Sequence, residues 1–514
     1  MGDPASWKKH NTNWDYRFWT DESLSSFIAA HFPELSTIYE AYPNPVMRAD
    51  LARYCLMYQF GGIYADVDTD CQGSLEEIAG DTRAIFCDEP RAHWGSATIR
   101  GLPCLVFNGT FASPAGHPVW RAMIEACVFM AHNENRLKND VLEQTGPLLL
   151  TSVLADFADK SMLSMNSCHL FAPADKKSVN DENERFGPHG HLQLSVHRWA
   201  GSWYRVRNQS RRSWLLGRLR HLLHSLTSGQ TLSFAQATRT IDVERLKRPI
   251  VSTTDTPSVV IFVPVRNGCP FIERCVELIT ALDHPKHLLR VVFCEGDSTD
   301  GSAELLKKMC VQNTPQCKEM TVIHCATGNK IERSKRWLPK HQRQRRSDIA
   351  KVRNTLIRQA IHAEDDWVLW LDVDVCDFPF DILKTLLLEK TKIVTPNCVQ
   401  KPGGKSFDLN SFLETGQTAR HTYFKHTKHG LFQPPANLYG RRHLDDLRYL
   451  KRVPLHGVGG TMLLVHADLH RAGLIFPEVP YKDLIETEAF GVLARDLGIL
   501  PIGLPRVEII HVST

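Results

Sequence analysis

The most constraining feature of this sequence is an apolar, β-branched run from Ser258 to Val265 (SVVIFVPV), which ends at the turn Arg266-Asn267-Gly268. A run of this kind, bounded by a turn, is typical of a buried strand. Segments of alternating helical and strand character follow it, namely Pro270 to Leu282 (helix), Leu289 to Cys294 (strand), Ser302 to Met309 (helix) and Met320 to Cys325 (strand). This alternation predicts an α/β fold with a mostly parallel sheet.

The chain is long enough for two large domains. Its 514 residues are 43% hydrophobic and 23% charged, which excludes disordered, collagen-like and coiled-coil proteins. From Trp14 to about Arg207 helical periodicity mixes with short apolar runs, and a polar, basic stretch separates this part from the run at Ser258. We therefore predict one domain over residues 1–207, a linker over 208–257 with a helix at Ser213 to Leu226, and a second domain over 258–514.

Charge, hydropathy and cysteine spacing exclude several classes of protein. A formal net charge of +4 is too small to require a polyanionic partner. No run of 18 apolar residues is present, and Met1 to Trp7 lacks the apolar segment of a secretory signal. The 14 cysteines include no Cys-x-x-Cys pair, which excludes zinc ribbons and thioredoxin-like motifs. We expect a soluble or peripheral protein without a membrane span in this chain.

Each half carries an Asp-x-Asp step directly after an apolar stretch. Asp66 and Asp68 follow Tyr64-Ala65, and Asp372 and Asp374 follow Leu369-Trp370-Leu371. Residues i and i+2 of a strand face the same side, so two carboxylates can converge on one hard cation such as Mg²⁺ or Mn²⁺ that also binds a diphosphate. The alternative is a solvated pair of acids in a turn. The repetition predicts two related sites.

The first Asp-x-Asp pair lies among blocks that follow one another in a recognisable order. A helical segment from Met47 to Tyr54 leads to Gly61-Gly62-Ile63-Tyr64, and Thr145-Gly146-Pro147 and His197 to Trp203 (HRWAGSW) follow. These blocks resemble the glycosyltransferases with a sugar-binding region containing the DXD motif, a family that includes fungal α-1,6-mannosyltransferases.

The resemblance implies a role for each matching residue in the first half. It places Arg48 and Asp50 at the sugar nucleotide, Asp66, Asp68 and His197 at the metal, and Ser202 and Trp203 over the diphosphate. From the residues alone, Arg53 is interpreted as the ordinary i, i+3 ion-pair partner of Asp50. His197 and Trp203 are equally compatible with core packing.

The first half departs from that family at its beginning. The family opens with a strand that reads like Ile-Pro-x-x-Ile-His-Gln-x-Trp, whereas only Met1 to Thr12 precede the segment Asn13 to Tyr16. We therefore expect the first strand to be absent or truncated, which leaves donor binding by this half open.

The second half matches a different family over about Ser258 to Val512. The matching blocks, in order, are Val263 to Asn267, Glu295 to Ser302, Ser347 to Asn354, Leu371 to Asp374, Gly459 to Val465, Ile485 to Glu488 and Gly503 to His511. This series is similar to the fungal mannan polymerase subunit family of Golgi α-mannosyltransferases, glycosyltransferase family 62. The resemblance implies a GT-A-like, Rossmann-like domain, and we expect a second such domain in the first half.

This second resemblance also implies site residues. It places Asp372, Asp374 and His511 at the metal, Arg353 at the donor phosphates, Arg266, Asn267, Glu295 and Asp297 at the nucleotide-sugar edge, and Glu486 and Glu488 as candidate catalytic acids near the acceptor or the transferred sugar. The two glutamates share one cleft if their segment is extended. They are otherwise helix N-terminal acids stabilised by the helix dipole. Outside the resemblance, His511 is interpreted as a packed core histidine. Carboxylates with an imidazole suit Mn²⁺, or Mg²⁺, as the cofactor.

A basic run precedes the second Asp-x-Asp pair. It comprises Arg333, Lys335, Arg336, Lys340, Arg343, Arg345 and Arg346. Nucleic-acid grooves interleave such charges with aromatic rings, and here Trp337 stands alone, so we expect no nucleic-acid partner. We interpret the run as a solvated, mobile loop, or as a surface for anionic lipid or an acidic partner subunit.

Together these patterns predict a metal-dependent glycosyltransferase. The resemblances imply transfer of mannose from GDP-mannose, with retention, to a mannose-containing oligosaccharide or glycoprotein in the Golgi. They also allow another glycosyltransferase subunit as a partner. Two alternatives stay open, namely a non-catalytic scaffold subunit of a glycan polymerase and a transferase for another sugar nucleotide such as UDP-galactose or UDP-glucose. Without the resemblance, the location is cytoplasmic or peripheral to a membrane.

Overall fold

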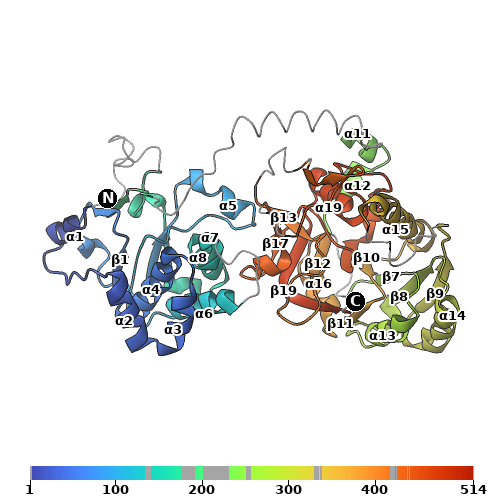
Figure 1. Ribbon diagram of the computed structural model, residues 1–514, viewed down its shortest axis with the longest axis horizontal. Coiled ribbons are helices and arrows are strands. Elements are labelled where there is room, and N and C mark those ends of the chain that lie inside the picture. Colours follow the sequence, from blue (N-terminus) through green and yellow to red (C-terminus); the bar gives the residue numbers. More distant parts are fainter. Residues whose placement is uncertain are drawn as a thin grey trace. The chain divides into compact units, whose positions relative to one another are not determined.

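The computed structural model describes residues 3–132, 140–175, 192–200, 231–250, 256–328, 335, 338–416, 423, 425–436, 438 and 440–512. The chain divides into two compact units, Met1–Arg207 (unit 1) and Asn208–Thr514 (unit 2), whose elements are labelled in Figure 1. The helix predicted at Ser213 to Leu226 and the site residues Ser202 and Trp203 lie outside the described residues. Among the described helices, none has both the length and the apolar composition that a membrane crossing requires.

Unit 1 is built from helices around a small mixed sheet. Its described helices and strands are α1 (Ala5–His10), α2 (Asp21–His31), α3 (Ser36–Ala41), α4 (Pro45–Phe60), β1 (Gly62–Ala65), β2 (Thr69–Cys71), β3 (Ala84–Cys87), α5 (Gly95–Thr98), β4 (Thr110–Ser113), α6 (Pro118–His132), α7 (Val141–Gln144), α8 (Pro147–Asp156), β5 (Leu163–Asn166) and β6 (Ser195–His197). The sheet order is β1-β4-β3-β5, and β2 pairs separately with β6. Among the described pairings of the sheet, β3 with β5 is parallel and the other two are antiparallel.

Local sequence explains how α4 delivers its residues to the end of β1. Asn44 caps the helix by accepting a hydrogen bond from the N–H of Val46 at 3.0 Å, and Pro45 occupies the first turn. Gly61 ends the helix with a φ of 63°, and a Cβ there would lie 2.3 Å from the backbone nitrogen of Ala115. Only glycine fits this sharp reversal, after which β1 begins at once.

Unit 2 holds the longer sheet. Its described helices and strands are α11 (Phe234–Thr238), α12 (Val243–Lys247), β7 (Val259–Val265), α13 (Cys269–Thr280), β8 (Leu289–Glu295), α14 (Ser302–Asn313), β9 (Glu319–His324), α15 (Pro339–Ala360), β10 (Trp367–Leu371), β11 (Val375–Asp377), α16 (Ile382–Leu388), β12 (Ile393–Val399), β13 (Phe412–Glu414), β14 (Thr427–Lys428), β15 (Leu431–Phe432), β16 (Arg441–His443), β17 (Val453–Pro454), β18 (Met462–His466), α18 (Ala467–Arg471), α19 (Glu486–Asp496) and β19 (Ile502–His511). The sheet order is β11-β19-β12-β18-β10-β7-β8-β9. Strands β10, β7, β8 and β9 run parallel to one another, and β18 runs antiparallel to β10.

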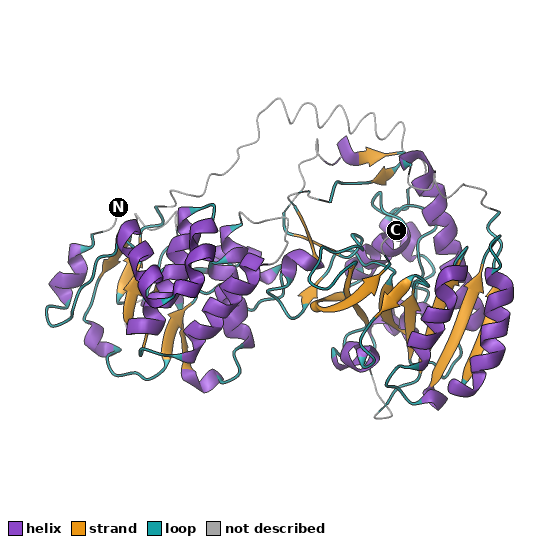
Figure 2. Cartoon of the chain, turned by 60° about the horizontal axis from the view of Figure 1, so that its bottom comes forward, coloured by secondary structure: helices purple, strands orange, loops and turns teal. Residues whose placement is uncertain are grey.

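The α/β fold predicted from the sequence is confirmed, and strands of both units lie among helices (Figure 2). The predicted alternation in unit 2 appears as β7, α13, β8, α14 and β9, with shifts of a few residues at the ends. Every residue of β7 except Pro264 is buried, as the continuous apolar run indicated.

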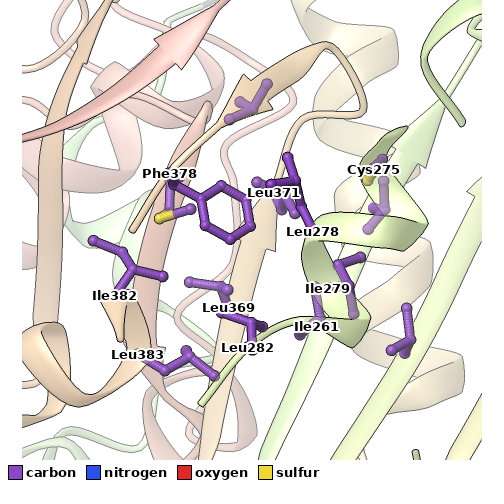
Figure 3. Packing of buried hydrophobic residues seen from close by; sticks show 14 of the residues in the cluster. Ile261, Cys275, Leu278, Ile279, Leu282, Leu369, Leu371, Phe378, Ile382 and Leu383 are labelled. Carbon is purple, nitrogen blue, oxygen red and sulfur yellow. The ribbon is translucent and has the colours of Figure 1, made fainter. Parts of the chain in front are cut away.

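The core of unit 2 fixes the sheet against its covering helices. Figure 3 shows Ile261, Leu369 and Leu371 of the sheet packed with Ile279 of α13 and Ile382 of α16. All of these side chains are buried. Because β10 is held in this core, the residues directly after Leu371 have a fixed place at the carboxyl edge of the parallel strands.

Candidate functional site

The three metal ligands expected in unit 1 lie together. Asp66 and Asp68 follow β1, and His197 ends β6, which pairs with β2 so that His197 stands opposite Thr69. The ligand atoms of Asp66, Asp68 and His197 all lie within 4.8 Å of one another, and His197 Nε2 is 3.0 Å from Asp68 Oδ1. Two carboxylates and an imidazole form a donor set suited to Mn²⁺ or Mg²⁺. Their metal role stays a prediction.

The surroundings of Asp68 stabilise its ionised form. Burial opposes ionisation, but hydrogen bonds from His197 and from the N–H of Ala200, the latter at 2.9 Å, outweigh it and hold the pKa of Asp68 below its usual range. The carboxylate therefore carries its charge at neutral pH.

Arg53, rather than Arg48, reaches the Asp-x-Asp pair. Arg53 Nη2 lies 3.1 Å from Asp50 Oδ1 and 3.3 Å from Asp66 Oδ1, whereas Arg48 donates to the carbonyl oxygen of Tyr42 at 3.0 Å. Burial raises the pKa of Asp50 to about 6, against the opposing effect of Arg53. Sequence reasoning noticed the i, i+3 pair of Asp50 and Arg53, but it missed that the same face of α4 points at Asp66.

A cavity of about 380 Å³ borders the unit 1 site. Residues 61–67 line it without interruption, as do residues 14–19, and Arg53 and Asp66 belong to both the cavity wall and the ion-pair cluster. Aromatic side chains supply much of the wall, namely Trp7, Trp14, Tyr16, Phe18, Trp19, Phe60 and Tyr64. The cavity gives a ligand direct access to Asp66.

In unit 2 the second Asp-x-Asp pair follows β10. The N–H of Asp372 donates to the carbonyl oxygen of Thr461 at 3.0 Å, which fixes the backbone beside β18. Strand β11 pairs with β19 so that Val375 stands opposite His511, and His511 Nε2 comes within 3.2 Å of Asp374 Oδ1. Within the described residues, only the unit 1 set has all its ligand atoms inside 4.8 Å. The chemistry of the unit 2 set, two carboxylates and an imidazole, nevertheless fits the same ions.

Arg353 joins Asp372 to Glu486. Its Nη2 donates to Asp372 Oδ1 at 3.1 Å, and its Nε donates to Glu486 Oε1 at 3.0 Å. The guanidinium is 3% exposed and lies over the ring of Trp370, 5.3 Å from the centroid. The arginine predicted to face the donor phosphates is thus already ion-paired on two sides.

Both candidate catalytic glutamates begin a helix. Segment 485–488 is not extended, since α19 starts at Glu486 and both acids lie in its first turn. Glu486 Oε2 is 3.7 Å from Arg346, and Glu488 lies between Arg346 at 2.7 Å and Arg441 at 3.4 Å. The helix-dipole interpretation fits this position. A catalytic role for either glutamate stays a prediction.

An ion-pair series therefore runs through unit 2 from the Asp-x-Asp pair. Its members, in order of contact, are Asp372, Arg353, Glu486, Arg346, Glu488, Arg441 and Glu414. The side chains between its two ends are buried to 87% or more. Such a series of alternating charges fixes the orientation of each side chain through its two neighbours.

Asp372 sits in a crowded acidic environment, although a third of its side chain is exposed. Burial, together with the carboxylates of Asp374, Glu486 and Asp408, outweighs Arg353 and raises its pKa to about 7. Sequence reasoning missed Asp408, whose Oδ2 accepts a hydrogen bond from Thr461 Oγ1 at 3.0 Å. No strand end or motif marks Asp408 in the sequence.

The residues expected at the nucleotide-sugar edge organise the loops after β7 and β8. Asn267 Oδ1 accepts from the N–H of Thr299 at 2.8 Å, and Glu295 Oε1 accepts from the N–H of Ser298 at 2.8 Å. Asp297 Oδ2 accepts from the N–H of Thr327 at 2.7 Å. Arg266 is half-buried at the end of β7. These loops lie at the carboxyl edge where open α/β sheets bind ligands.

The interpretation of the whole basic run as a mobile loop is wrong for its second part. The residues of the run that belong to α15, which begins at Pro339 and packs against α19, are Lys340, Arg343, Arg345 and Arg346. Burial lowers the pKa of Arg345, whose charge is close enough to interact with Asp372 and Asp374. Arg333, Arg336 and Trp337 lie outside the described residues.

Comparison with known families gives two matches within the chain. The Anp1 family model matches residues 237–480, and the model described as "Glycosyltransferase sugar-binding region containing DXD motif" matches residues 2–85. The two matches fall on opposite halves, as the ordered sequence blocks indicated.

Known relatives include mannan polymerase subunits and a mannosyltransferase. The mannan polymerase complex subunit mnn9 of Schizosaccharomyces pombe is 30% identical over 247 residues, which are 45% of this chain and 73% of the relative. The mannan polymerase complex subunit MNN9 of Candida albicans is 27% identical over 264 residues, 47% of this chain and 72% of the relative. Inositol phosphoceramide mannosyltransferase 3 of S. pombe is 31% identical over 141 residues, 27% of this chain and 36% of the relative.

Among solved structures, a mannosyltransferase, PcManGT from Pyrobaculum calidifontis in complex with GDP-Man and Mn²⁺, is similar at 18% identity. The alignment covers 59% of this chain and 68% of that one, with a TM-score of 0.30.

Proposed function

Because the chain belongs to the Anp1 family of mannan polymerase subunits and is a glycosyltransferase, we propose that it transfers mannose from GDP-mannose to a mannose-containing glycan with retention of configuration. The proposed catalytic domain spans residues 258–514, after a linker at 208–257. The observation that carries the proposal is the arrangement at the end of β10, where Asp374 contacts His511 and Asp372 contacts Arg353. We place the activity in the Golgi, in association with a further glycosyltransferase subunit.

The proposed cofactor is Mn²⁺, or Mg²⁺, held in unit 2 by Asp372, Asp374 and His511. When bound, the ion supplies positive charge to the diphosphate of the donor and to the departing nucleotide. In unit 1 the corresponding ligands are Asp66 and Asp68 with His197, and residues 1–207 are proposed to form a second DXD glycosyltransferase domain.

The chain's own residues hold the reactants in place. Arg353 fixes the orientation of Asp372, and Asn267 and Asp297 shape the loops that bind the nucleotide. Arg345 adds positive charge near the two aspartates. Positioning of the donor against an acceptor hydroxyl then contributes the rest of the rate enhancement.

A second candidate is a non-catalytic subunit of a glycan polymerase complex. The observation that favours it is that Arg353, Glu486 and Glu488 are each already ion-paired. A third candidate, a transferase for another sugar nucleotide, rests on the same Asp-x-Asp chemistry, which does not distinguish nucleotides.

The test is sugar transfer by the full chain with GDP-mannose and Mn²⁺. We expect Asp372→Ala/Asp374→Ala to abolish transfer to a mannose oligosaccharide and Asp66→Ala/Asp68→Ala to leave it measurable. Asp377→Ala is the matched control, because Asp377 is a nearby acid whose side chain is 63% exposed. If the parent chain transfers no sugar from GDP-mannose, UDP-galactose or UDP-glucose, the scaffold candidate replaces this proposal.

A further inference from the structure

The Asp-x-Asp sites of the two units share an arrangement that extends beyond the proposed metal ligands. In each unit the first aspartate of the pair contacts a buried arginine. That arginine also contacts another carboxylate, which is buried and lies outside the Asp-x-Asp pair. In unit 1 the order is Asp66, Arg53 and Asp50, with separations of 3.3 and 3.1 Å. In unit 2 it is Asp372, Arg353 and Glu486, with separations of 3.1 and 3.0 Å.

The surroundings of the two arginines also correspond. Each lies on the helix that precedes the Asp-x-Asp strand, α4 for Arg53 and α15 for Arg353. Each guanidinium lies over an aromatic ring of that strand, Tyr64 at 4.9 Å in unit 1 and Trp370 at 5.3 Å in unit 2. In each unit a histidine contacts the second aspartate. The resemblance therefore covers the whole cluster.

From this correspondence we infer that Glu486 is a positioning residue, which orients Asp372 for metal binding through Arg353 as Asp50 orients Asp66 through Arg53. The inference rests on the proposed metal role of Asp372 in the transferase, and it gives Glu486 a role other than contact with the sugar.

Charge explains why the second carboxylate is present. An arginine beside the first aspartate alone would cancel its charge and weaken its attraction for a cation. Three carboxylates and one guanidinium give each cluster a net charge of −2 when its histidine is neutral, which matches a divalent ion. The second carboxylate also accepts a hydrogen bond from one N–H group of the planar guanidinium. The remaining N–H groups then face the aspartate in one orientation.

The two carboxylates reach their arginines by different routes. Asp50 lies one turn before Arg53 on α4, where an i, i+3 contact is expected from the helix alone. Glu486 comes from the start of α19, 133 residues after Arg353, and adopts a left-handed φ of 59°. A non-glycine residue rarely adopts this conformation, and such strain is concentrated at functional sites. Local helix geometry therefore does not account for the shared contact.

The test is Mn²⁺ binding by the full chain, measured from the electron paramagnetic resonance signal of free Mn²⁺ without any donor. The background carries Asp66→Asn/Asp68→Asn, so that unit 2 holds the remaining site. We expect Glu486→Gln to weaken Mn²⁺ binding 10- to 100-fold, the usual effect of removing a partner that orients a ligand. Glu486→Asp, which keeps the charge, should recover part of the loss. Asp50→Asn should have the same effect in the Asp372→Asn/Asp374→Asn background.

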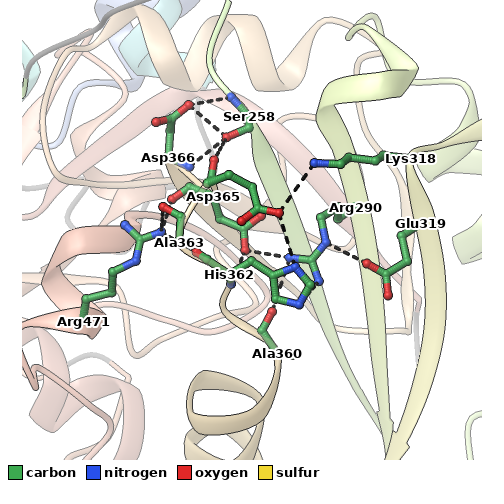
Figure 4. A network of polar contacts seen from close by, with 11 residues as sticks. Ser258, Arg290, Lys318, Glu319, Ala360, His362, Ala363, Asp365, Asp366 and Arg471 are labelled. Carbon is green, nitrogen blue, oxygen red and sulfur yellow. Dashed lines mark hydrogen bonds and ion pairs between the residues drawn. The ribbon is translucent and has the colours of Figure 1, made fainter.

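The matched control is Asp365→Asn. Asp365 is buried and accepts a hydrogen bond from Arg290 at 2.7 Å in a network that includes Glu319 and His362 but neither Asp-x-Asp pair (Figure 4). Like Glu486→Gln, the Asp365→Asn substitution removes a buried carboxylate that pairs with an arginine. We expect a lower unfolding temperature with unchanged Mn²⁺ binding. Arg353→Lys is the second test variant, because it keeps the charge of Arg353 and lacks the fork that holds two carboxylates.

The outcomes separate this inference from the proposed function. The inference is overturned if Glu486→Gln and Arg353→Lys bind Mn²⁺ as tightly as the Asp66→Asn/Asp68→Asn chain that carries them. It is also overturned if that chain binds no Mn²⁺. If the chain binds Mn²⁺ and both variants weaken binding, but no sugar is transferred, the inference stands and the proposed transferase fails.

Discussion

Unit 1 and unit 2 build similar acidic clusters from contacts of very different range. In unit 1 one helix supplies both Asp50 and Arg53, and the whole carboxylate–arginine pair is visible in a four-residue stretch of sequence. In unit 2 the corresponding partners, Arg353 and Glu486, lie on different helices and are 133 residues apart in the chain. The feature that the two units share is therefore the cluster of charges, whereas the helices and strands that supply it differ.

The two clusters also differ in the direction in which the pKa of an aspartate is shifted. In unit 1, hydrogen bonds from His197 and Ala200 keep the pKa of Asp68 below its usual range despite burial. In unit 2, burial and the nearby carboxylates raise the pKa of Asp372 to about 7. Contacts within unit 1 therefore stabilise the ionised form of Asp68, whereas the surroundings of Asp372 in unit 2 oppose its ionised form. Four experiments test this contrast.

The largest effect is expected from removing the arginines. Arg53→Met leaves the buried Asp50 without its ion-pair partner, whereas after Arg353→Met the carboxylate of Glu486 still has Arg346 at 3.7 Å. Loss of one partner of a buried pair costs about 3–5 kcal/mol. We expect a loss in this range for unit 1 and a smaller one for unit 2, measured by hydrogen exchange of α4 and α15 in urea. Equal losses of stability in the two variants would show that Arg346 does not compensate the charge of Glu486 when Arg353 is absent.

Acid sensitivity should distinguish the two units next. Trp370, under Arg353, donates from Nε1 to His470 Nε2 at 3.2 Å, whereas in unit 1 the hydroxyl of Tyr64 donates to Asp66 at 2.8 Å. Burial lowers the pKa of His470 to about 4. The unfolded chain binds the proton below about pH 6.5, so stability rises with pH between 4 and 6.5 and is level above that range.

The expected size of this effect is about 3 kcal/mol for unit 2. His456, whose pKa burial also lowers to about 4, adds a slope of the same sign. Comparison of the parent with His470→Gln isolates the first contribution, with hydrogen exchange of β10 at pH 4.5 and pH 7 as the measurement and β3 of unit 1 as the internal reference. An unchanged pH slope in His470→Gln would contradict the assignment.

Two glycines next to the clusters should give intermediate effects. A Cβ at Gly460 would lie 2.3 Å from Arg353 Nη2, whereas a Cβ at Gly109 would lie 2.5 Å from the ring of Phe107 and 3.0 Å from Asp66 Oδ2. Overpacking of this kind costs about 1–3 kcal/mol. We expect both alanine variants to lose stability, but only Gly460→Ala to weaken Mn²⁺ binding about 10-fold, because it displaces the arginine fork. Equal Mn²⁺ affinities in the two variants would remove the distinction.

How much can be predicted from the sequence depends on how far apart in the chain the contacting residues lie. The strands β7, β8 and β9 and the helices between them were predictable because their apolar periodicity is local. The Asp-x-Asp pairs were visible as acids after apolar runs. The histidines were assigned through family resemblance alone, since nothing local links His197 to Asp68.

The errors have the same physical origin. The expected i, i+3 pair of Arg53 with Asp50 is confirmed, but its contact with Asp66 is not predictable, because spacing shows which residues share a helix face and not what that face meets. Asp408 and the contact of Arg353 with Glu486 depend on how distant segments pack. The run of basic residues in α15 favours a solvated loop when only the sequence is considered, because the acids on α19 that pair with Arg346 lie about 140 residues away in the chain.

The smallest effect is expected at the outer end of the ion-pair series of unit 2. Glu414, with 41% of its side chain exposed, lies 3.5 Å from Arg441, and exposed pairs contribute at most about 1 kcal/mol. Glu414→Gln should therefore change stability by less than that and leave Mn²⁺ binding unaltered. Glu125→Gln in unit 1, which breaks the exposed pair with Arg121 at 3.0 Å, is the matched control. If Glu414→Gln instead weakens Mn²⁺ binding, the orientation of Asp372 depends on every member of the ion-pair series, as far as the surface. Among the described residues, the short cluster of unit 1 has no counterpart to such an effect.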